Sequence, residues 1–335
     1  MTGTAASRSK GLSSLPDWVR GEAAALALVA AFALIGYGLF PDDLALLTRI
    51  IAIACLVLSL DLVMGYCGVI TLGQAALYGT SAYAVGNACI AGITDPVALL
   101  GVGIVAGALT GIVSGMLITR FSGLPQLVIS IAFGQLVAAL ANKLSAFTGG
   151  SDGLSGITPS ALFGVFDFDL VGNTSFGFSL AVLGIVMMLL LRFVRSPFGL
   201  MCRGIRDDAL RARMIGTSIY PRLIAMYAVS GAVAGVGGAL SAINVGVVGL
   251  DSVSFELSAE ALVMLVVGGA GSLWGALFGA ILFQIFQHIV GAASPFQWMT
   301  IVGLVLVAIT LFAPRGLYSV IRRGLMKIGR SRVPS

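Results

Sequence analysis

Apolar runs of about 20 residues recur along almost the whole chain of 335 residues. The hydrocarbon core of a bilayer is about 30 Å thick, and a helix of roughly 20 apolar residues crosses it. Hydrophobic residues make up 58% of the chain and charged residues only 10%, whereas soluble proteins carry about 25% charged residues. The sequence therefore predicts an all-α membrane protein of about ten transmembrane helices, near residues 23–40, 44–64, 69–91, 96–119, 124–142, 174–192, 223–248, 257–273, 274–291 and 297–313.

Two segments, 257–291 and 69–91, differ from a simple apolar span. The stretch 257–291 is too long for one span, and Gly268, Gly269 and Gly271 supply a break within it, since glycine is a poor residue for a helix interior. The segment 69–91 is unusually polar for a span, so we expect it to face protein or a cavity rather than lipid. Its polar residues are Thr71, Gln74, Thr80, Ser81 and Asn87.

The distribution of charge predicts the orientation in the membrane, because lysine and arginine collect in cytoplasmic loops. Ten spans place the basic segments on one side: the tails 1–21 and 314–335, the link at Arg120, and the stretch 192–222 with seven arginines. We expect cytoplasmic termini, a transmembrane permease domain at 22–313, a cytoplasmic loop at 193–222 and a periplasmic loop at 143–172. The loops on the periplasmic side carry Asp42, Asp43, Asp95, Asp152, Asp167, Asp169, Asp251 and Glu256, against one clear cation, Lys143.

Glycines recur at every fourth position in two spans, at 103, 107, 111 and 115 and again at 271, 275 and 279. Such a stripe lets a neighbouring helix backbone come close. The two stripes share the strings GALTG (107–111) and GALFG (275–279), which lie five spans apart and so run in opposite directions. This spacing indicates a possible inverted five-helix repeat, an architecture in which the transport pathway lies between the repeats.

The sequence lacks the residue sets required for ATP hydrolysis, zinc binding and serine hydrolysis. The chain has no GxxxxGK[ST] phosphate-binding loop, so any ATP hydrolysis is expected from another subunit. It has no CxxC pair and a single histidine, His288, which does not suffice for a zinc site. The segment Gly153–Gly156 resembles the GxSG of intramembrane serine proteases, but Ser155 is expected in a polar outer loop away from a base. We expect no cofactor, no metal, no nucleic-acid partner and no enzyme activity.

Five polar side chains within the spans are candidates for the translocation pathway: Asp61, Gln74, Asn87, Asn244 and Glu260. Polar and ionisable groups are costly in lipid and often mark solute pathways. An inverted repeat would pair the third span with the eighth, and these spans carry Gln74, Asn87 and Glu260. The alternative is that each side chain only forms structural hydrogen bonds.

The loop at 193–222 shows the pattern of a short helix. Ser196 suits an N-cap, Pro197 a first helical position and Gly216 a C-terminal cap. Arg203 with Asp207, and Asp207 with Arg211, have the i,i+4 spacing of helical ion pairs. We expect one rigid helix that Leu210→Pro would unfold, at a cost of about 3 kcal/mol. The alternative is a solvated loop whose arginines bind anionic lipid.

Three motifs resemble a known family. They are Gly65-Tyr66-Cys67-Gly68 followed by 70–76 (ITLGQAA), the string 148–157 (TGGSDGLSGI), and Ser196-Pro197-Phe198-Gly199 with Arg206-Asp207-Asp208 and Gly216. Together they resemble the LivM-type permease subunits of bacterial branched-chain amino acid ABC importers, over roughly residues 45–320. Two departures are visible: Ala209-Leu210-Arg211-Ala212 stands where the family often has Glu-x-Ala-Ala, and Asp61 where it often has Asn.

The resemblance implies a multi-pass protein of the bacterial inner membrane. Its implied partners are a second related permease subunit, two ABC ATPase subunits and a periplasmic substrate-binding protein. The cytoplasmic loop would insert into a cleft on the ATPase. From its acidic, glycine-rich composition and its placement opposite the arginine loops, we expect the periplasmic loop, with Gly150, Ser151, Asp152 and Gly153, to help receive solute from the binding protein. The residues implied in ATPase coupling are Arg203, Arg206, Asp207, Asp208, Leu210, Arg211, Met214 and Gly216.

Other functions stay open from the sequence alone. Relatives within the same family import urea, short amides or aromatic acids. A stand-alone channel or facilitator would need no ATPase, and a patterned cytoplasmic loop argues against it. An intramembrane hydrolase would depend on Ser155.

Overall fold

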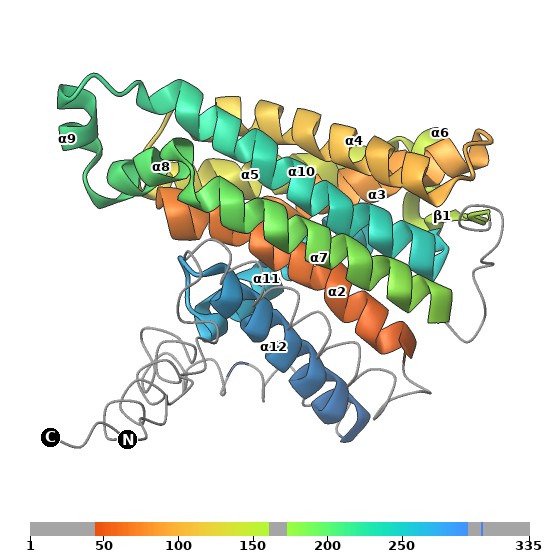
Figure 1. Cartoon of the computed structure of the whole chain (residues 1–335). Helices are drawn as coiled ribbons and strands as arrows, with labels where there is room; N and C mark the ends of the chain where they lie inside the picture. Colours follow the sequence, from red (N-terminus) through yellow and green to blue (C-terminus); the bar gives the residue numbers. More distant parts are fainter. Residues whose placement is uncertain (1–43, 161–172, 294–302, 304–335) are drawn as a thin grey trace, which may run out of the picture.

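The computed structural model describes residues 44–160, 173–293 and 303, and it is built almost entirely from helices (Figure 1). The spans expected at 23–40 and 297–313 and the tails at 1–21 and 314–335 lie outside the described residues. Six helical segments of the described part are long and apolar enough to cross a membrane. These are Leu44–Tyr66, Pro96–Ile118, Leu124–Lys143, Asn173–Arg195, Ile219–Val245 and Leu273–Gly291. The chain is therefore an all-helical, multi-pass membrane protein.

The helices follow the apolar runs closely. They are α2 (Leu44–Leu60) continued by the π-helical η1 (Asp61–Tyr66), α3 (Gln74–Ile90), α4 (Pro96–Ile118), α5 (Leu124–Lys143), α7 (Asn173–Arg195), α10 (Ile219–Val245), α11 (Phe255–Gly268) and α12 (Leu273–Ala293). The predicted break in 257–291 is confirmed, because α11 ends at Gly268 and α12 begins at Leu273. Gly269 and Gly271 have φ angles of 102° and 86° in the turn between them.

Helix α2 is the centre of the bundle. Most of its side chains are fully buried, including Leu56 and Leu58. It contacts α7, α10, α11 and α12, while α10 also packs along α3 and α4. A helix that is apolar all round and enclosed by other helices is typical of the core of a large bundle.

The two glycine stripes are helix-packing surfaces, as expected, except that Gly271 lies in the turn before α12 rather than on that helix. A Cβ atom on Gly107 of α4 would overlap the carbonyl oxygen of Gly231 on α10. In the second stripe, a Cβ atom on Gly279 of α12 would overlap the backbone of Met264 on α11. Only glycine lets the backbones approach this closely.

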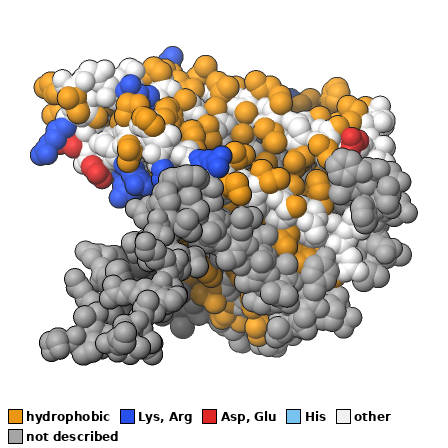
Figure 2. Space-filling model, in the orientation of Figure 1, with side chains coloured by type: hydrophobic (Ala, Val, Ile, Leu, Met, Phe, Trp, Pro, Cys, Tyr) orange, Lys and Arg blue, Asp and Glu red, His pale blue; other side chains and the backbone are white. Residues whose placement is uncertain are grey.

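Short elements gather at the two ends of the bundle. One end holds α6 (Ser145–Thr148), η2 (Gly150–Asp152), η3 (Leu250–Val253) and the strands β1 (Leu154–Ser155) and β2 (Val247–Val248). The strands pair antiparallel, with Leu154 opposite Val248. The other end holds α8 (Pro197–Asp207) and α9 (Ala209–Met214) (Figure 1). Basic side chains gather toward this second end, while apolar side chains cover the length of the helices (Figure 2).

Candidate functional site

The 193–222 loop contains two helices, so the prediction of one continuous helix is wrong. Asp208 separates α8 from α9 in an extended conformation, with φ −158° and ψ 99°. Its Oδ1 accepts hydrogen bonds of 3.0 Å from the backbone N–H groups of Leu210 and Arg211. A carboxylate that caps new N–H groups in this way starts a helix, and this is the physical reason for the break.

The break also changes the ion pairs. Asp207 lies 3.8 Å from Nε of Arg206, and Asp208 lies 2.8 Å from Nε of Arg211. These replace the predicted pairs of Asp207 with Arg203 and Arg211, because Asp207 and Arg211 stand on different helices. Arg203 turns instead toward Tyr66.

The expected effect of Leu210→Pro must be corrected as well. Leu210 is the second residue of α9, and proline is tolerated in the first turn of a helix. The substitution would remove one capping hydrogen bond, which is worth about 1 kcal/mol, rather than unfold the helix. Proline is expected to disrupt α9 most strongly beyond its first turn, at residues 212 and 213.

Both ends of the loop structure match the sequence pattern. The Ser196 hydroxyl accepts from the N–H of Gly199 at 3.4 Å and Pro197 opens α8. At the far end Gly216 has φ 82°. The N–H of Gly216 donates to Arg213 O and that of Thr217 to Ala212 O, at 3.0 and 3.1 Å. This pattern is a Schellman motif, which fixes the end of α9.

The α9 tip, which we define as Leu210, Arg211, Arg213, Met214 and Ile215, points away from the bundle. Its three apolar side chains are 66%, 81% and 84% exposed, for Leu210, Met214 and Ile215. Arg211 and Arg213 are exposed beside them. Exposed apolar residues gathered with cations at the end of a preorganised helix are typical of a contact with another protein.

The inner face of α8 rests on η1. Cys202 and Ile205 are buried there, and the thiols of Cys202 and Cys67 share a hydrogen bond. The guanidinium carbon of Arg203 lies 4.9 Å from the ring centroid of Tyr66, within the range of a cation–π interaction. These contacts fix α8 against η1.

Arg206 and Asp61 tie three elements together. Nη1 of Arg206 donates to the carbonyl oxygen of Gly65 in η1. Oδ1 of Asp61, at the start of η1, accepts a 2.6 Å hydrogen bond from the N–H of Gly271 in the α11–α12 turn. Sequence reasoning proposes Asp61 and Arg206 for separate roles and misses their contacts with Gly271 and Gly65, because these contacts join distant parts of the chain.

Gln74 and Asn87 lie at opposite ends of α3. Nε2 of Gln74 donates to Ser230 Oγ on α10 at 2.7 Å and to Ser59 O on α2 at 3.2 Å. Nδ2 of Asn87 donates to Phe147 O at 2.8 Å, at the end that holds α6. Gln74 is buried and Asn87 half-buried.

Asn244 and Glu260 have different neighbours again. Nδ2 of Asn244 donates to Ser179 Oγ on α7 at 3.0 Å. Glu260 on α11 shares a hydrogen bond with Gln287 on α12 and interacts with the charge of Arg49 on α2. The five predicted pathway side chains therefore have different partners on different elements.

The outer-loop motif packs against the loop that follows α10. Gly149, Gly150 and Gly153 all have φ between 62° and 73°. Gly153 lies against the carbonyl of Val248, where a Cβ atom would be 2.7 Å from the oxygen. Ser151 and Asp152 remain exposed, so this loop presents a polar edge to the solvent.

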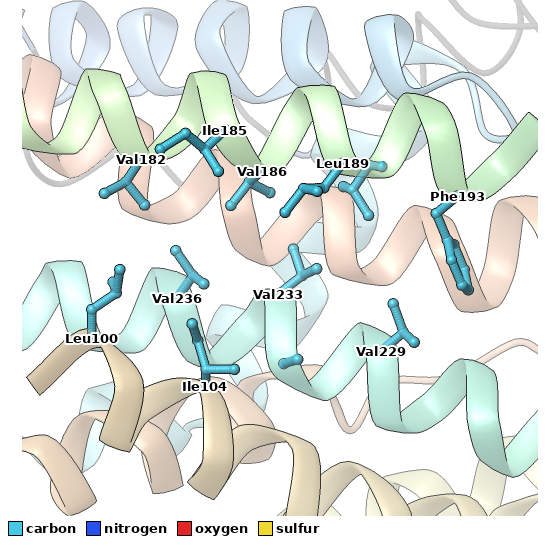
Figure 3. Close-up of a pocket in the computed structure, with 12 residues that line it drawn as sticks. Leu100, Ile104, Val182, Ile185, Val186, Leu189, Phe193, Val229, Val233 and Val236 are labelled. Atoms are coloured by element: carbon cyan, nitrogen blue, oxygen red, sulfur yellow. The ribbon is translucent and has the colours of Figure 1, made fainter. Parts of the chain in front are cut away.

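An apolar groove of about 410 Å³ lies between α4, α7 and α10 (Figure 3). It is lined only by aliphatic and aromatic side chains, among them Ile104, Val186, Phe193 and Val233. It therefore offers a polar solute no side-chain hydrogen bond. Among residues 44–160 and 173–293, no group of three or more His, Cys, Asp or Glu side chains is placed to hold a metal ion.

Comparison with known proteins identifies the family. A family model described as "Branched-chain amino acid transport system / permease component" matches residues 44–313. The chain belongs to this permease family. It is 29% identical over 305 residues to the high-affinity branched-chain amino acid transport system permease protein LivM of Escherichia coli (strain K12), covering 84% of this permease and 70% of that protein.

Two further relatives show the breadth of the family. The LivM protein of Salmonella typhimurium is 27% identical to this permease over 315 residues, covering 87% of this chain and 73% of that protein. The fructose import permease protein FrcC of Rhizobium meliloti is 25% identical over 224 residues, covering 62% and 60%. No solved structure matches this permease.

Proposed function

We propose that this permease is a membrane-spanning subunit of a bacterial inner-membrane ABC importer for branched-chain amino acids. The observation that carries the proposal is the family match over residues 44–313, together with LivM relatives that align over more than four fifths of the chain. Its partners are two ATPase subunits, a second related permease and a periplasmic binding protein. ATP hydrolysis belongs to the ATPase subunits.

The α9 tip is the ATPase contact in this proposal. It is the part of the cytoplasmic loop that extends farthest from the bundle (Figure 1), and it exposes apolar and basic side chains together. The capping bonds of Asp208 and the Schellman motif at Gly216 hold it rigid. Rigidity is needed because a flexible element would absorb the movement of the ATPase. Asp208 and Arg211 form an ion pair at its base.

The helix contacts support the inverted repeat. Helices α3 and α4 pack on α10, and α11 and α12 pack on α2, while α3 contacts α4 as α11 contacts α12. Exchanging α2 with α10, α3 with α11 and α4 with α12 therefore maps each of these contacts onto another of them. In such a repeat the solute pathway runs near the contact of the two halves.

Among the pathway candidates, burial separates two groups. Asp61 and Gln74 are fully buried and hydrogen-bonded between helices, so they act as ties within the bundle. Asn87 and Glu260 are only partly buried and are the candidates for contact with the solute. Asn244 joins α10 to α7.

The test is transport by the assembled complex. The chain is co-expressed with its proposed ATPase and permease partners, reconstituted in liposomes, and supplied with binding protein and radiolabelled leucine. We expect uptake that requires both ATP inside and loaded binding protein outside. Uptake of leucine without ATP would support a facilitator instead.

A second experiment tests which solute is imported. It is needed because one relative is a fructose import permease, so family membership alone does not determine the solute. Unlabelled isoleucine and valine should compete with leucine, whereas urea, acetamide and benzoate should not. Competition by one of these three alone would reassign the substrate and keep the ABC importer.

A further inference from the structure

A cluster of polar contacts joins α8 to two breaks in the membrane helices. The first break is η1, where α2 leaves α-helical geometry at Asp61 and helical structure ends before Gln74. The second is the turn between α11 and α12. The repeat described above assigns one break to each half of the permease. Departures from α-helical geometry are frequent at functional sites.

Arg206 is in contact with both breaks. It donates to the carbonyl oxygen of Gly65 in the first break. In the second, a Cβ atom on Gly271 would lie 3.0 Å from Nη1 of Arg206 and 3.2 Å from the carbonyl oxygen of Gly65. The guanidinium group therefore sits where the two breaks meet. A side chain at residue 271 would also be strained, because its φ is 86°.

Asp61 closes the link from inside the membrane domain. Its carboxylate is fully buried and accepts from the N–H of Gly271 at 2.6 Å. It also interacts electrostatically with Arg206 and Arg203, which offsets part of the cost of burying its charge. A Cβ atom on Gly65 would overlap both this carboxylate and the Gly271 nitrogen, so the three groups fit together only with glycine at position 65.

We infer that Asp61 and Arg206 are positioning residues that link α8 to the two halves of the permease, so that a displacement of α8 moves both breaks together. The inference rests on the proposed function, because the ATPase is what displaces α8. Arg206 connects α8 to the first break, and Asp61 connects the first break to the second. Loss of either side chain leaves α8 docked through Cys202 and Ile205 but uncouples one half of the pathway from it.

The test compares Arg206→Gln, Asp61→Leu and Asp61→Asn in the reconstituted importer, with Arg120→Gln as the control that removes a different exposed cytoplasmic arginine. The readouts are solute imported per ATP hydrolysed and subunit stoichiometry. Asp61→Asn keeps an oxygen that accepts from Gly271 and should retain the wild-type ratio. Arg206→Gln and Asp61→Leu should assemble and lose about tenfold in the ratio, since residues of one network couple strongly.

The double variant sharpens the result. Asp61→Leu with Arg206→Gln should be no worse than the worse single variant, because both changes break the same link. Losses that multiply would overturn the inference, as would a wild-type ratio in Arg206→Gln, which removes a partly exposed side chain and leaves the fold intact. If the wild-type complex itself shows no ATP-dependent import, the proposed function fails instead. If the wild-type complex imports solute and the Arg206→Gln variant is fully active, only the inferred role of Arg206 and Asp61 is refuted.

Discussion

The backbone N–H of Gly271 donates a 2.6 Å hydrogen bond to Oδ1 of Asp61, although 210 residues separate the two positions. The bond joins the end of α2 to the turn between α11 and α12. Because Arg206 of α8 contacts both segments, the loop that we propose meets the ATPase is connected both to η1 and to the α11–α12 turn.

The packing of α4 on α10 gives a prediction about assembly. Gly107→Val should prevent close approach of the two helices, because a side chain at 107 meets the carbonyl of Gly231, and overpacking of this kind costs about 1–3 kcal/mol or more. Gly101→Ala on the same helix is the matched control, since a Cβ atom there meets nothing within 4 Å. Thermal unfolding in detergent should show a lower midpoint for Gly107→Val only. Equal midpoints would contradict the packing.

The orientation in the membrane is tested with single cysteines. The four native cysteines, at positions 55, 67, 89 and 202, are all buried, so background labelling is low. Ser151 and Arg213 are exposed at opposite ends of the bundle. Ser151→Cys should react with an impermeant maleimide added to intact spheroplasts, and Arg213→Cys only after the membrane is broken. The reverse labelling pattern would show that the protein has the opposite orientation in the membrane.

The cap of α9 gives a prediction about the 193–222 loop. Gly216→Val forces a β-branched residue to adopt φ 82°, at a cost of about 1–2 kcal/mol. The last turn of α9 should loosen, and stimulation of ATP hydrolysis by loaded binding protein should fall. Gly204→Ala in α8 is the control, because its added methyl group meets nothing within 4 Å. A fully stimulated Gly216→Val complex would show that the Schellman motif is not needed for coupling.

Local patterns in the sequence predicted much of this architecture. Apolar runs set the spans, the glycines at 268–271 set the break before α12, and Ser196 and Gly216 set the ends of the cytoplasmic loop structure. Each of these signals is written in adjacent residues. The split of the loop at Asp208 was missed, because an aspartate beside another aspartate reads equally well as part of a charged helix or as a new N-cap.

Contacts between distant segments were beyond the sequence. The pairing of Leu154 with Val248 involves strands of two residues each, too short for any alternation of apolar and polar residues. The π-helical turn of η1 and the bond from Gly271 to Asp61 depend on α8, α11 and α12 coming together. The sequence makes Asp61 a pathway candidate because it is an ionisable residue within an apolar span, but it does not show that Gly271 is its hydrogen-bond partner.

The central claim is that α9 is a rigid element through which ATP hydrolysis drives import. Arg213→Pro tests it most directly, because proline at the fifth residue of α9 removes an N–H and clashes with the preceding turn, costing about 3 kcal/mol. Arg213→Ala removes the same charge and keeps the helix. In liposomes with loaded binding protein and ATP, we predict that Arg213→Ala imports leucine and Arg213→Pro does not, with equal subunit stoichiometry. Leucine uptake by the Arg213→Pro complex at the rate of Arg213→Ala would contradict the claim.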